Sequence, residues 1–254
     1  MTIKRLSATR YVLPLREGGS LPAIIDTEDG QYVVKFRGAG QGPKALVAEL
    51  IAAGIAQAVG LSMPDAAVID LKEGFGLNEP DPEIQDLLKG SVGENFGLRY
   101  LPGAFGYEPA ADRDSINTVA AAAIVWFDAL ISNVDRTANN PNLLLWGDRV
   151  WLIDHGASLY FHHAPGDWSS RSQERFALIR QHILLDQAGD LRVADADMRP
   201  RLTEKVLERI VASIPDEWLD GDPEAQRKAY VTYLLARLNG DRPWLEEAEN
   251  ARRV

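Results

Sequence analysis

The stretch Asp135-Arg-Thr-Ala-Asn-Asn140, followed by Leu152-Ile-Asp154-His-Gly156, carries the pattern that decides the fold. A carboxylate stands five positions before an amide, and a short apolar segment then ends in Asp-X-Gly. Phosphoryl transfer needs such a set, because one carboxylate can orient an attacking hydroxyl while an amide oxygen and a second carboxylate hold Mg²⁺ against the nucleotide phosphates. The spacing therefore predicts a phosphoryl-transfer enzyme in which Asp135 orients the acceptor and Asn140 and Asp154 bind the metal ion.

Other polar residues of this stretch leave alternatives open. Asn139 and Asn142 compete with Asn140 for the amide position, and the spacing favours Asn140. Arg136 has two interpretations of similar weight, which are a place near the substrate or Asp135 and an ion pair that stabilises the loop. Asp-Arg and Asn-Pro-Asn are each common in turns, so the prediction depends on the whole set rather than on any one residue.

We expect neither a catalytic role nor a zinc site for the histidines at residues 155, 162 and 163. His155 follows the metal-binding aspartate, and we expect it to pack or cap rather than to catalyse. His162 and His163 are adjacent, so in regular structure their side chains point in different directions and form a poor zinc site. The sequence has no cysteine, which excludes disulfides and thiolate metal sites.

Composition narrows the classes of partner. The 254 residues carry a formal net charge of −10, which argues against binding nucleic acid through its phosphates. No apolar run reaches about 18 residues, so no membrane span is expected; the longest, residues 119–131, contains Asp128 and indicates a buried helix. No signal-peptide core follows the first residues, and we expect a cytoplasmic protein.

Hydrophobic periodicity predicts an α+β fold with two lobes. Residues 1–101 form a β-rich lobe with one long helix, and residues 102–254 form a helical lobe that carries the Asp135 loop and a metal-binding hairpin. We expect a protein-kinase-like arrangement with the ligand cleft between the lobes. The predicted strands are residues 8–15, 21–26, 31–36, 66–71, 95–101, 142–146 and 150–154, and the predicted helices are residues 44–59, 114–132 and a series beyond residue 173 that is interrupted at Pro200, Pro215 and Pro223.

Lys35 and Glu49 are candidates for holding the nucleotide. Lys35 lies in an otherwise apolar strand and could reach the phosphates, as the strand lysine does in kinases. The alternative is a lysine that faces solvent. Glu49 lies on the first long helix and could pair with Lys35, although most helix glutamates are simply solvated.

Two glycine-rich turns and one connector complete the candidate nucleotide site. Gly18, Gly19 and Ser20 could close over the phosphates through backbone N–H groups, or could form a plain hairpin. The loop at residues 38–42 lacks the Lys-Ser/Thr ending of a P-loop, and a flexible connector is the favoured interpretation. We expect adenine to lie against residues 96–101, through side chains that include those of Leu98 and Tyr100.

At these residues the sequence resembles the HipA-like kinase family and, more distantly, the phosphatidylinositol kinases. The resemblance rests on the Asp135–Asn140 loop, the strand end at Asp154, the Lys35 strand and the Glu49 helix. It implies that Asp135 is the catalytic carboxylate, that Asn140 and Asp154 bind Mg²⁺, and that Lys35 contacts phosphate. By location alone, it also makes Ser20 a candidate for the family's phosphorylated serine.

The expected function is ATP- and Mg²⁺-dependent transfer of the γ-phosphate to a hydroxyl acceptor, with protein serine or threonine as the first choice. A lipid or small-molecule alcohol is the second choice. Small-molecule phosphotransferases usually place a histidine two positions before the aspartate, where this chain has Asn133. A nucleotide-binding pseudokinase or partner-binding module is the alternative outside catalysis, and an antitoxin-like partner follows from the family resemblance only.

Overall fold

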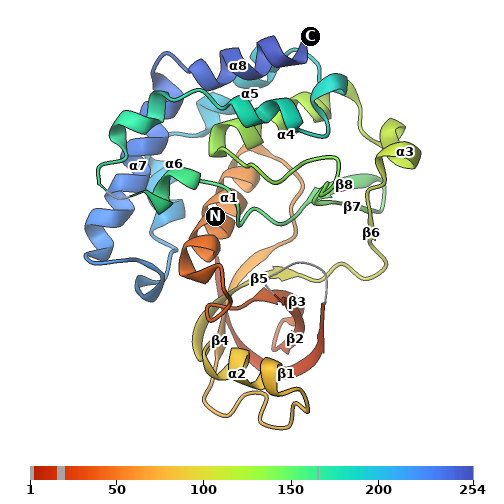
Figure 1. The fold of residues 1–254 in the computed structure, drawn as a ribbon, viewed down its shortest axis with the longest axis vertical. Helices are drawn as coiled ribbons and strands as arrows, with labels where there is room; N and C mark the ends of the chain where they lie inside the picture. The colour runs from red at the N-terminus through yellow and green to blue at the C-terminus, as the bar shows by residue number, and fades with distance from the viewer. Residues whose placement is uncertain (1–2, 16–20, 165, 254) are drawn as a thin grey trace.

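Five strands close into a barrel in the computed structural model of the chain, which describes residues 3–15, 21–164 and 166–253 (Figure 1). The strand order around the barrel is β1-β2-β3-β5-β4, and a parallel pairing of β1 with β4 closes it. The remaining neighbours are antiparallel. The strands are β1 Lys4–Pro14, β2 Ala23–Thr27, β3 Gly30–Lys35, β4 Ala66–Leu71 and β5 Gly93–Arg99.

Alternation along β3 decides which way Lys35 points. Tyr32 and Val34 are fully buried in the apolar cluster that fills the barrel. Successive side chains of a strand point to opposite faces, so Val33 and Lys35 face outward. Lys35 is thereby directed to the side of the barrel from which the first helix starts.

Helix α1, Gly42–Val59, leaves the barrel and runs into the helical part of the molecule (Figure 1). Pro43 suits its first turn, and Gly60 ends it with a φ of 86°, a left-handed conformation that favours glycine. By length and composition alone α1 could cross a membrane, but 72% of it is buried inside the protein, as expected for a core helix. Gly54 gives α6 a close approach, because a Cβ there would lie 2.6 Å from Ile210 Cγ2.

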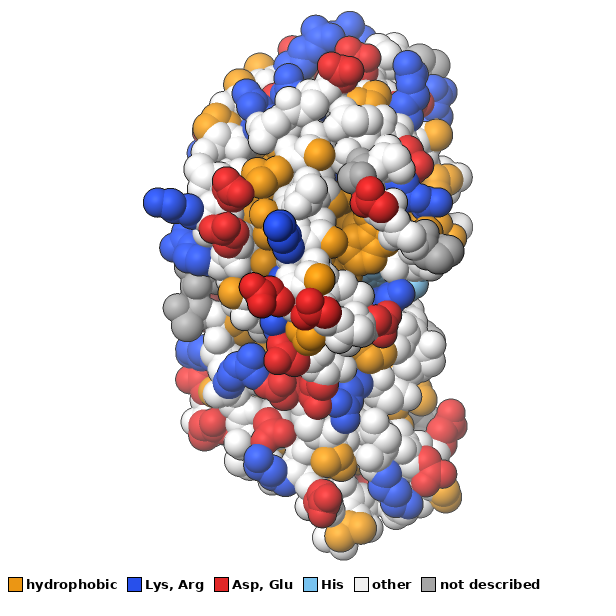
Figure 2. Space-filling view, turned by 90° about the vertical axis from the view of Figure 1, so that its left-hand side faces the viewer, with side chains coloured by type: hydrophobic (Ala, Val, Ile, Leu, Met, Phe, Trp, Pro, Cys, Tyr) orange, Lys and Arg blue, Asp and Glu red, His pale blue; other side chains and the backbone are white. Residues whose placement is uncertain are grey.

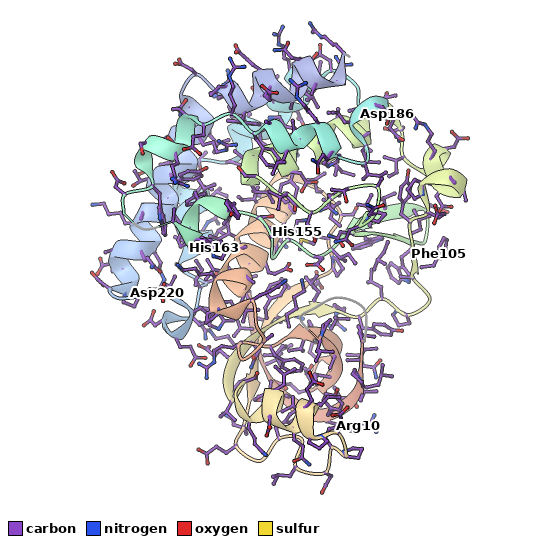
Figure 3. All side chains as sticks on the ribbon, viewed as in Figure 1. Arg10, Phe105, His155, His163, Asp186 and Asp220 are labelled. Atoms are coloured by element: carbon purple, nitrogen blue, oxygen red, sulfur yellow. The ribbon has the colours of Figure 1, made fainter. Side chains whose placement is uncertain are left out.

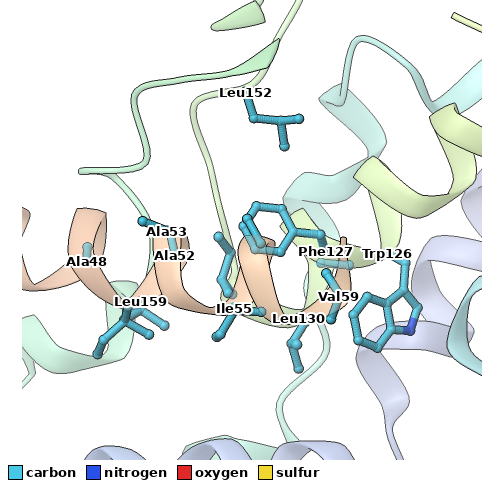
Figure 4. Close-up of a cluster of buried hydrophobic side chains, with 14 of the residues drawn as sticks. Ala48, Ala52, Ala53, Ile55, Val59, Trp126, Phe127, Leu130, Leu152 and Leu159 are labelled. Carbon is cyan, nitrogen blue, oxygen red and sulfur yellow. The ribbon is translucent and has the colours of Figure 1, made fainter. Parts of the chain in front are cut away.

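The carboxy-terminal part packs helices around α1 and α4 into one large apolar core. Figure 4 shows Phe127 and Leu130 of α4 beside Ile55 and Val59 of α1. The helices beyond α1 are α2 Pro82–Lys89, α3 Pro109–Asp112, α4 Thr118–Ile131, α5 Leu191–Met198, α6 Glu204–Val211, α7 Pro223–Asn239 and α8 Pro243–Arg252.

A small sheet of three strands stands next to this core. Its order is β6-β7-β8, with β6 Phe105–Gly106, β7 Leu143–Trp146 and β8 Arg149–Leu152. The β7–β8 turn contains Gly147 at a φ of 60°. This is the hairpin expected from the sequence, and it ends two residues before Asp154.

Several boundaries differ from those expected. Helix α4 starts at Thr118 rather than at Asp114, because the Asn117 side chain caps it by accepting the Ala120 N–H at 2.9 Å. Residues 82–89, for which no helix was predicted, form α2 with Asp81 as its cap. The turn at Gly18, Gly19 and Ser20 lies outside the described residues.

Charges of both signs are mixed over the face in Figure 2, and basic side chains form no continuous band there. Many of the surface charges are paired in short ion pairs, such as Arg201 with Asp197 at 2.6 Å.

Candidate active site

Lys35 joins two carboxylates that are far from it in the sequence. Its Nζ donates to Glu49 Oε1 on α1 and to Asp154 Oδ1 beyond β8. The Lys35 side chain is 12% exposed and Glu49 is fully buried. Burial opposes the charged form of the ammonium, but the two carboxylates outweigh it and raise the pKa of Lys35 above its usual value. The lysine therefore stays charged at neutral pH.

Glu49 is held on one side by Lys35 and on the other by the backbone. Its Oε1 also accepts the His155 N–H at 3.0 Å. Burial raises the pKa of the Glu49 carboxyl, while Lys35 and this backbone hydrogen bond counteract the rise. The expected pairing of the strand lysine with the helix glutamate is therefore present, and it extends to the segment after β8.

The Asp135 loop gathers the second half of the site. Asp135 Oδ2 accepts from Asn140 Nδ2 at 2.7 Å and from Asn142 Nδ2 at 3.3 Å. Thr137 and Asn140 exchange two backbone hydrogen bonds of 3.1 Å, which fold the loop back on itself. Asp135 and Asn140, the two residues that the spacing selected in this loop, are therefore in direct contact. Asn142, one of the two competing amides, contacts Asp135 as well.

Asp154 follows β8 in a left-handed conformation with a φ of 56°. This conformation is uncommon for a residue other than glycine and occurs often at functional sites. Burial opposes ionisation of its carboxyl, but the Lys35 ammonium outweighs burial and lowers the pKa of Asp154. The Asn142 amide lies 3.5 Å from the Asp154 carbonyl oxygen, so Asn142 contacts both halves of the site.

Leu98 and Tyr100 remain predictions as nucleotide contacts. Leu98 is 7% exposed and lies in the main apolar core, with its backbone paired to Val33 and Ala66. Tyr100 is half-buried, and its N–H donates to the Gln31 carbonyl at 2.9 Å. No hydrogen bond within the described part of the chain connects either side chain to Lys35. Gly18, Gly19 and Ser20 lie outside that part.

A buried ion pair lies beneath the Asp135 loop. Arg136 Nε donates to Asp128 Oδ2 at 2.6 Å, and both side chains are shielded from solvent. His182 Nε2 lies 3.0 Å from the same oxygen, and Asn133 Nδ2 donates to Asp128 Oδ1 at 2.8 Å. Burial would raise the pKa of Asp128, but Arg136 and His182 outweigh it and hold the pKa well below its usual range. Of the two interpretations of Arg136, the structure contains the ion pair.

His155 connects this buried pair to the Lys35 cluster near the middle of the molecule (Figure 3). Its Nε2 lies 2.8 Å from Arg136 Nη2, and its ring packs edge-on against Phe127 at a centroid distance of 5.5 Å. Burial and the Arg136 charge lower the pKa of His155 to about 3, so the ring is neutral at pH 7. Sequence reasoning expected packing here, but it gave no signal for the contact with Arg136.

The adjacent histidines do not assemble a metal centre. His162 Nδ1 lies 3.0 Å from the Tyr230 hydroxyl, and His162 Nε2 lies 3.2 Å from His163 Nε2. Across residues 3–15, 21–164 and 166–253, no three histidine or acidic side chains converge on a metal position. The Lys35 ammonium contacts two carboxylates, those of Glu49 and Asp154, and the Asp135 carboxylate contacts two amides, those of Asn140 and Asn142.

Comparison with known proteins identifies the family of the chain and a solved structure with a similar fold. A family model described as HipA-like kinase matches residues 11–246. The structure is similar to that of the proinflammatory kinase CtkA of Helicobacter pylori, with a TM-score of 0.60 and 13% identity, over 99% of this chain and 98% of that one. A search of curated proteins found no match. At this identity the structural neighbour indicates the fold alone, whereas the family match covers most of the chain.

Proposed function

The chain belongs to the HipA-like kinase family, and on this premise we propose that it transfers the γ-phosphate of ATP to a hydroxyl group in the presence of Mg²⁺. The observation that carries the proposal is the buried Lys35 ammonium bound to both Glu49 and Asp154. A lysine fixed in this way stays charged, which suits it to contact nucleotide phosphates as the strand lysine does in kinases.

We propose that the barrel side, residues 1–101, and the helical side, residues 102–254, act as the two lobes around the nucleotide. Lys35 belongs to the first side and Asp154 to the second, and their contact spans the two. In this arrangement Lys35 binds the α- and β-phosphates, and Leu98 and Tyr100 contact adenine. A phosphate contact by Gly18, Gly19 and Ser20 stays a prediction from the sequence, because these residues lie outside the described part of the chain.

The donor set suits Mg²⁺, which prefers oxygen ligands and is commonly held by one or two protein groups plus substrate phosphates. Asp154 offers a carboxylate whose side chain is 43% exposed. Asn140 donates through its amide nitrogen to Asp135, which orients its amide group within the loop. Asn140 and Asp154 would hold the ion, which when bound neutralises charge on the transferred phosphoryl group.

Asp135 is the proposed catalytic carboxylate. Its hydrogen bonds with Asn140 and Asn142 both fall on Oδ2. Oδ1 of the half-buried side chain can then accept the proton of an acceptor hydroxyl and direct its oxygen at the phosphorus. Fixing one oxygen by two amides also limits rotation of the carboxylate, which favours attack from a single direction.

Protein serine or threonine is the proposed acceptor, and a lipid or small-molecule alcohol is the second candidate. Small-molecule phosphotransferases usually carry a histidine where this chain has Asn133. Here Asn133 instead donates to Asp128 at 2.8 Å and accepts the Asp135 N–H at 3.1 Å. An antitoxin-like partner remains a proposal by family analogy.

The test is transfer of label from γ-labelled ATP with Mg²⁺ to three acceptor pools, which are a cell-protein extract, lipid vesicles and a set of small alcohols. We expect label in acid-stable phosphoserine or phosphothreonine and none when a chelator removes the metal. Label that appears only in lipids or alcohols would select the second acceptor class. Mg²⁺-dependent ATP binding without transfer to any pool would favour a pseudokinase.

A further inference from the structure

Two buried polar atoms face each other between α1 and the segment that follows β8. They are Glu49 Oε2 and His155 Nδ1, which lie 3.9 Å apart in fully buried side chains. Neither has a hydrogen-bond partner among the described residues. Since an unpaired buried polar atom is costly, an acceptor and a ring nitrogen left facing each other indicate an interaction that these two elements make.

Arg136 decides which ring nitrogen of His155 carries the proton. A guanidinium can only donate, and Arg136 Nη2 lies 2.8 Å from His155 Nε2. Nε2 therefore accepts, so in a neutral ring the proton is on Nδ1. The group that faces the Glu49 oxygen is thus an N–H donor, and a shift of about 1 Å would bring it to hydrogen-bond distance.

We infer that His155 is a positioning residue whose ring, with Nδ1 facing Glu49 on α1 and Nε2 accepting from Arg136, joins α1 to the ion pair beneath the Asp135 loop. The inference rests on the proposed function, because it concerns how the same site is kept in order. The backbone N–H of His155 already donates to Glu49 Oε1 at 3.0 Å, and Glu49 binds Lys35 through that oxygen.

The path continues from Arg136 to the proposed catalytic carboxylate. Arg136 is anchored by Asp128 at 2.6 Å and donates through Nη1 to the Asn142 carbonyl at 2.5 Å. The Asn142 amide in turn reaches Asp135 at 3.3 Å. A displacement of α1 that moves Glu49 is therefore transmitted through one ring and one guanidinium to the Asp135 loop.

Replacement of His155 by phenylalanine separates packing from hydrogen bonding. A phenyl ring retains the edge-on contact with Phe127, which has a centroid distance of 5.5 Å. It offers neither an acceptor to Arg136 nor a donor to Glu49. A role limited to filling space predicts that His155→Phe behaves as the wild type, whereas a positioning role predicts a loss.

The direct test is NMR of the full chain labelled with ¹⁵N-histidine. We expect one ring, assigned to His155 by its loss in His155→Phe, to carry its proton on Nδ1 with Nε2 unprotonated. Glu49→Gln should shift its Nδ1 resonance and Arg136→Lys its Nε2 resonance, while the ring of His162, held by Tyr230, changes little. A ring protonated on Nε2, a cationic ring, or no response to either variant would overturn the inference.

Kinetics then test the positioning role with the acceptor found active. We expect His155→Phe to lower kcat at least tenfold while the Kd for Mg²⁺-ATP changes less than threefold. In a Glu49→Gln background the same substitution should cost less than threefold, because the connection is already broken. Equal losses in both backgrounds would contradict a connection through Glu49. His163→Gln, at an exposed ring, is the matched control.

Two further results keep the inference separate from the proposed function. If the wild type transfers phosphate to no acceptor, the proposed function is wrong, and the NMR experiment alone decides whether the hydrogen-bonded connection exists. If His155→Phe does not fold, His155→Asn replaces it. The side-chain amide introduced by His155→Asn can reach only the position of Nδ1. We therefore expect the NMR resonance of this amide to shift in Glu49→Gln and not in Arg136→Lys, and the reverse pattern would refute the inference.

Discussion

At the scale of residues, some contacts of the site could be predicted from the sequence and others could not. The pairing of Lys35 with Glu49 could be predicted, because a lone lysine in an apolar strand and a glutamate on the next helix form a known combination. The contact of Lys35 with Asp154 spans 119 positions and depends on how the barrel meets the β7–β8 hairpin. An ion pair was one of two interpretations of Arg136, but its partner Asp128 and its burial were not predicted, since a loop arginine next to a carboxylate gives no signal of burial.

Removal of the Asp154 carboxylate tests its part in metal and nucleotide binding. Asp154→Asn keeps the size of the side chain but removes a negative charge next to Lys35. We expect the Kd for Mg²⁺-ATP, measured by calorimetry, to rise on the order of tenfold or more. Asp148→Asn is the matched control, because Asp148 lies exposed in the β7–β8 turn. An unchanged Kd in Asp154→Asn would contradict the metal assignment.

At the scale of elements, periodicity and turn residues located most strands and the helices α1 and α4 to within a few positions, whereas the helices beyond residue 173 were predicted only as an interrupted series. Strand β4 and the end of α1 agree with the prediction, since apolar patterns and Gly60 mark them in the sequence. Closure of the barrel could not be predicted, because the parallel pairing of β1 with β4 brings together strands separated by α1. The start of α4 was missed because Asn117, rather than Asp114, supplies the cap.

Contact between α1 and α6 depends on the absence of a side chain at Gly54. We expect Gly54→Ala to lower the free energy of unfolding by about 1–2 kcal/mol, because crowding against Ile210 outweighs the better helix propensity of alanine. Urea denaturation measures this change. Gly40→Ala, where an added Cβ meets nothing within 4 Å, is the control.

A double variant checks the physical reason for that loss. Ile210→Ala removes the two carbons nearest to the added methyl group, so Gly54→Ala should cost less in the Ile210→Ala background than in the wild type. Equal costs in both backgrounds would show that the crowding is not the cause.

His162 makes stability depend on pH. Burial, followed by the nearby His163 and Lys44, lowers the pKa of His162 to about 3. The unfolded histidine titrates near 6.5, so the contribution of the neutral His162 ring to the free energy of unfolding is complete above pH 6.5. This contribution falls by about 1.4 kcal/mol per pH unit as the pH drops toward 3. Between pH 7 and pH 5, the free energy of unfolding of His162→Gln should therefore fall by about 2 kcal/mol less than that of the wild type. Urea denaturation at each pH measures this difference.

The matched control for this pH dependence is His163→Gln, at the neighbouring exposed ring. His163→Gln should lose nearly as much free energy of unfolding between pH 7 and pH 5 as the wild type does, because an exposed ring can be protonated in the folded state. If His162→Gln retained the wild-type pH dependence, the neutral state of His162 would not be its source.

At the scale of the whole molecule, the barrel and the helical part are also joined by a second set of contacts, made by residues other than Lys35 and Asp154. Trp218 Nε1 donates to the Glu94 carbonyl of β5 at 2.9 Å, and Glu217 accepts the Glu94 N–H at 2.6 Å and pairs with Arg37 at 2.6 Å. This junction was not predicted from the sequence, because its residues carry no pattern of their own. It connects the two sides that the proposed function requires around the nucleotide.

The measurement that tests the central claim most directly compares the wild type with Asp135→Asn in two assays, transfer of the γ-phosphate and binding of Mg²⁺-ATP. We predict that transfer falls by on the order of 100- to 10,000-fold while the Kd for Mg²⁺-ATP changes little, because the substitution removes the carboxylate that orients the hydroxyl and leaves Asn140, Asp154 and Lys35 in place. Full transfer by Asp135→Asn would contradict the account.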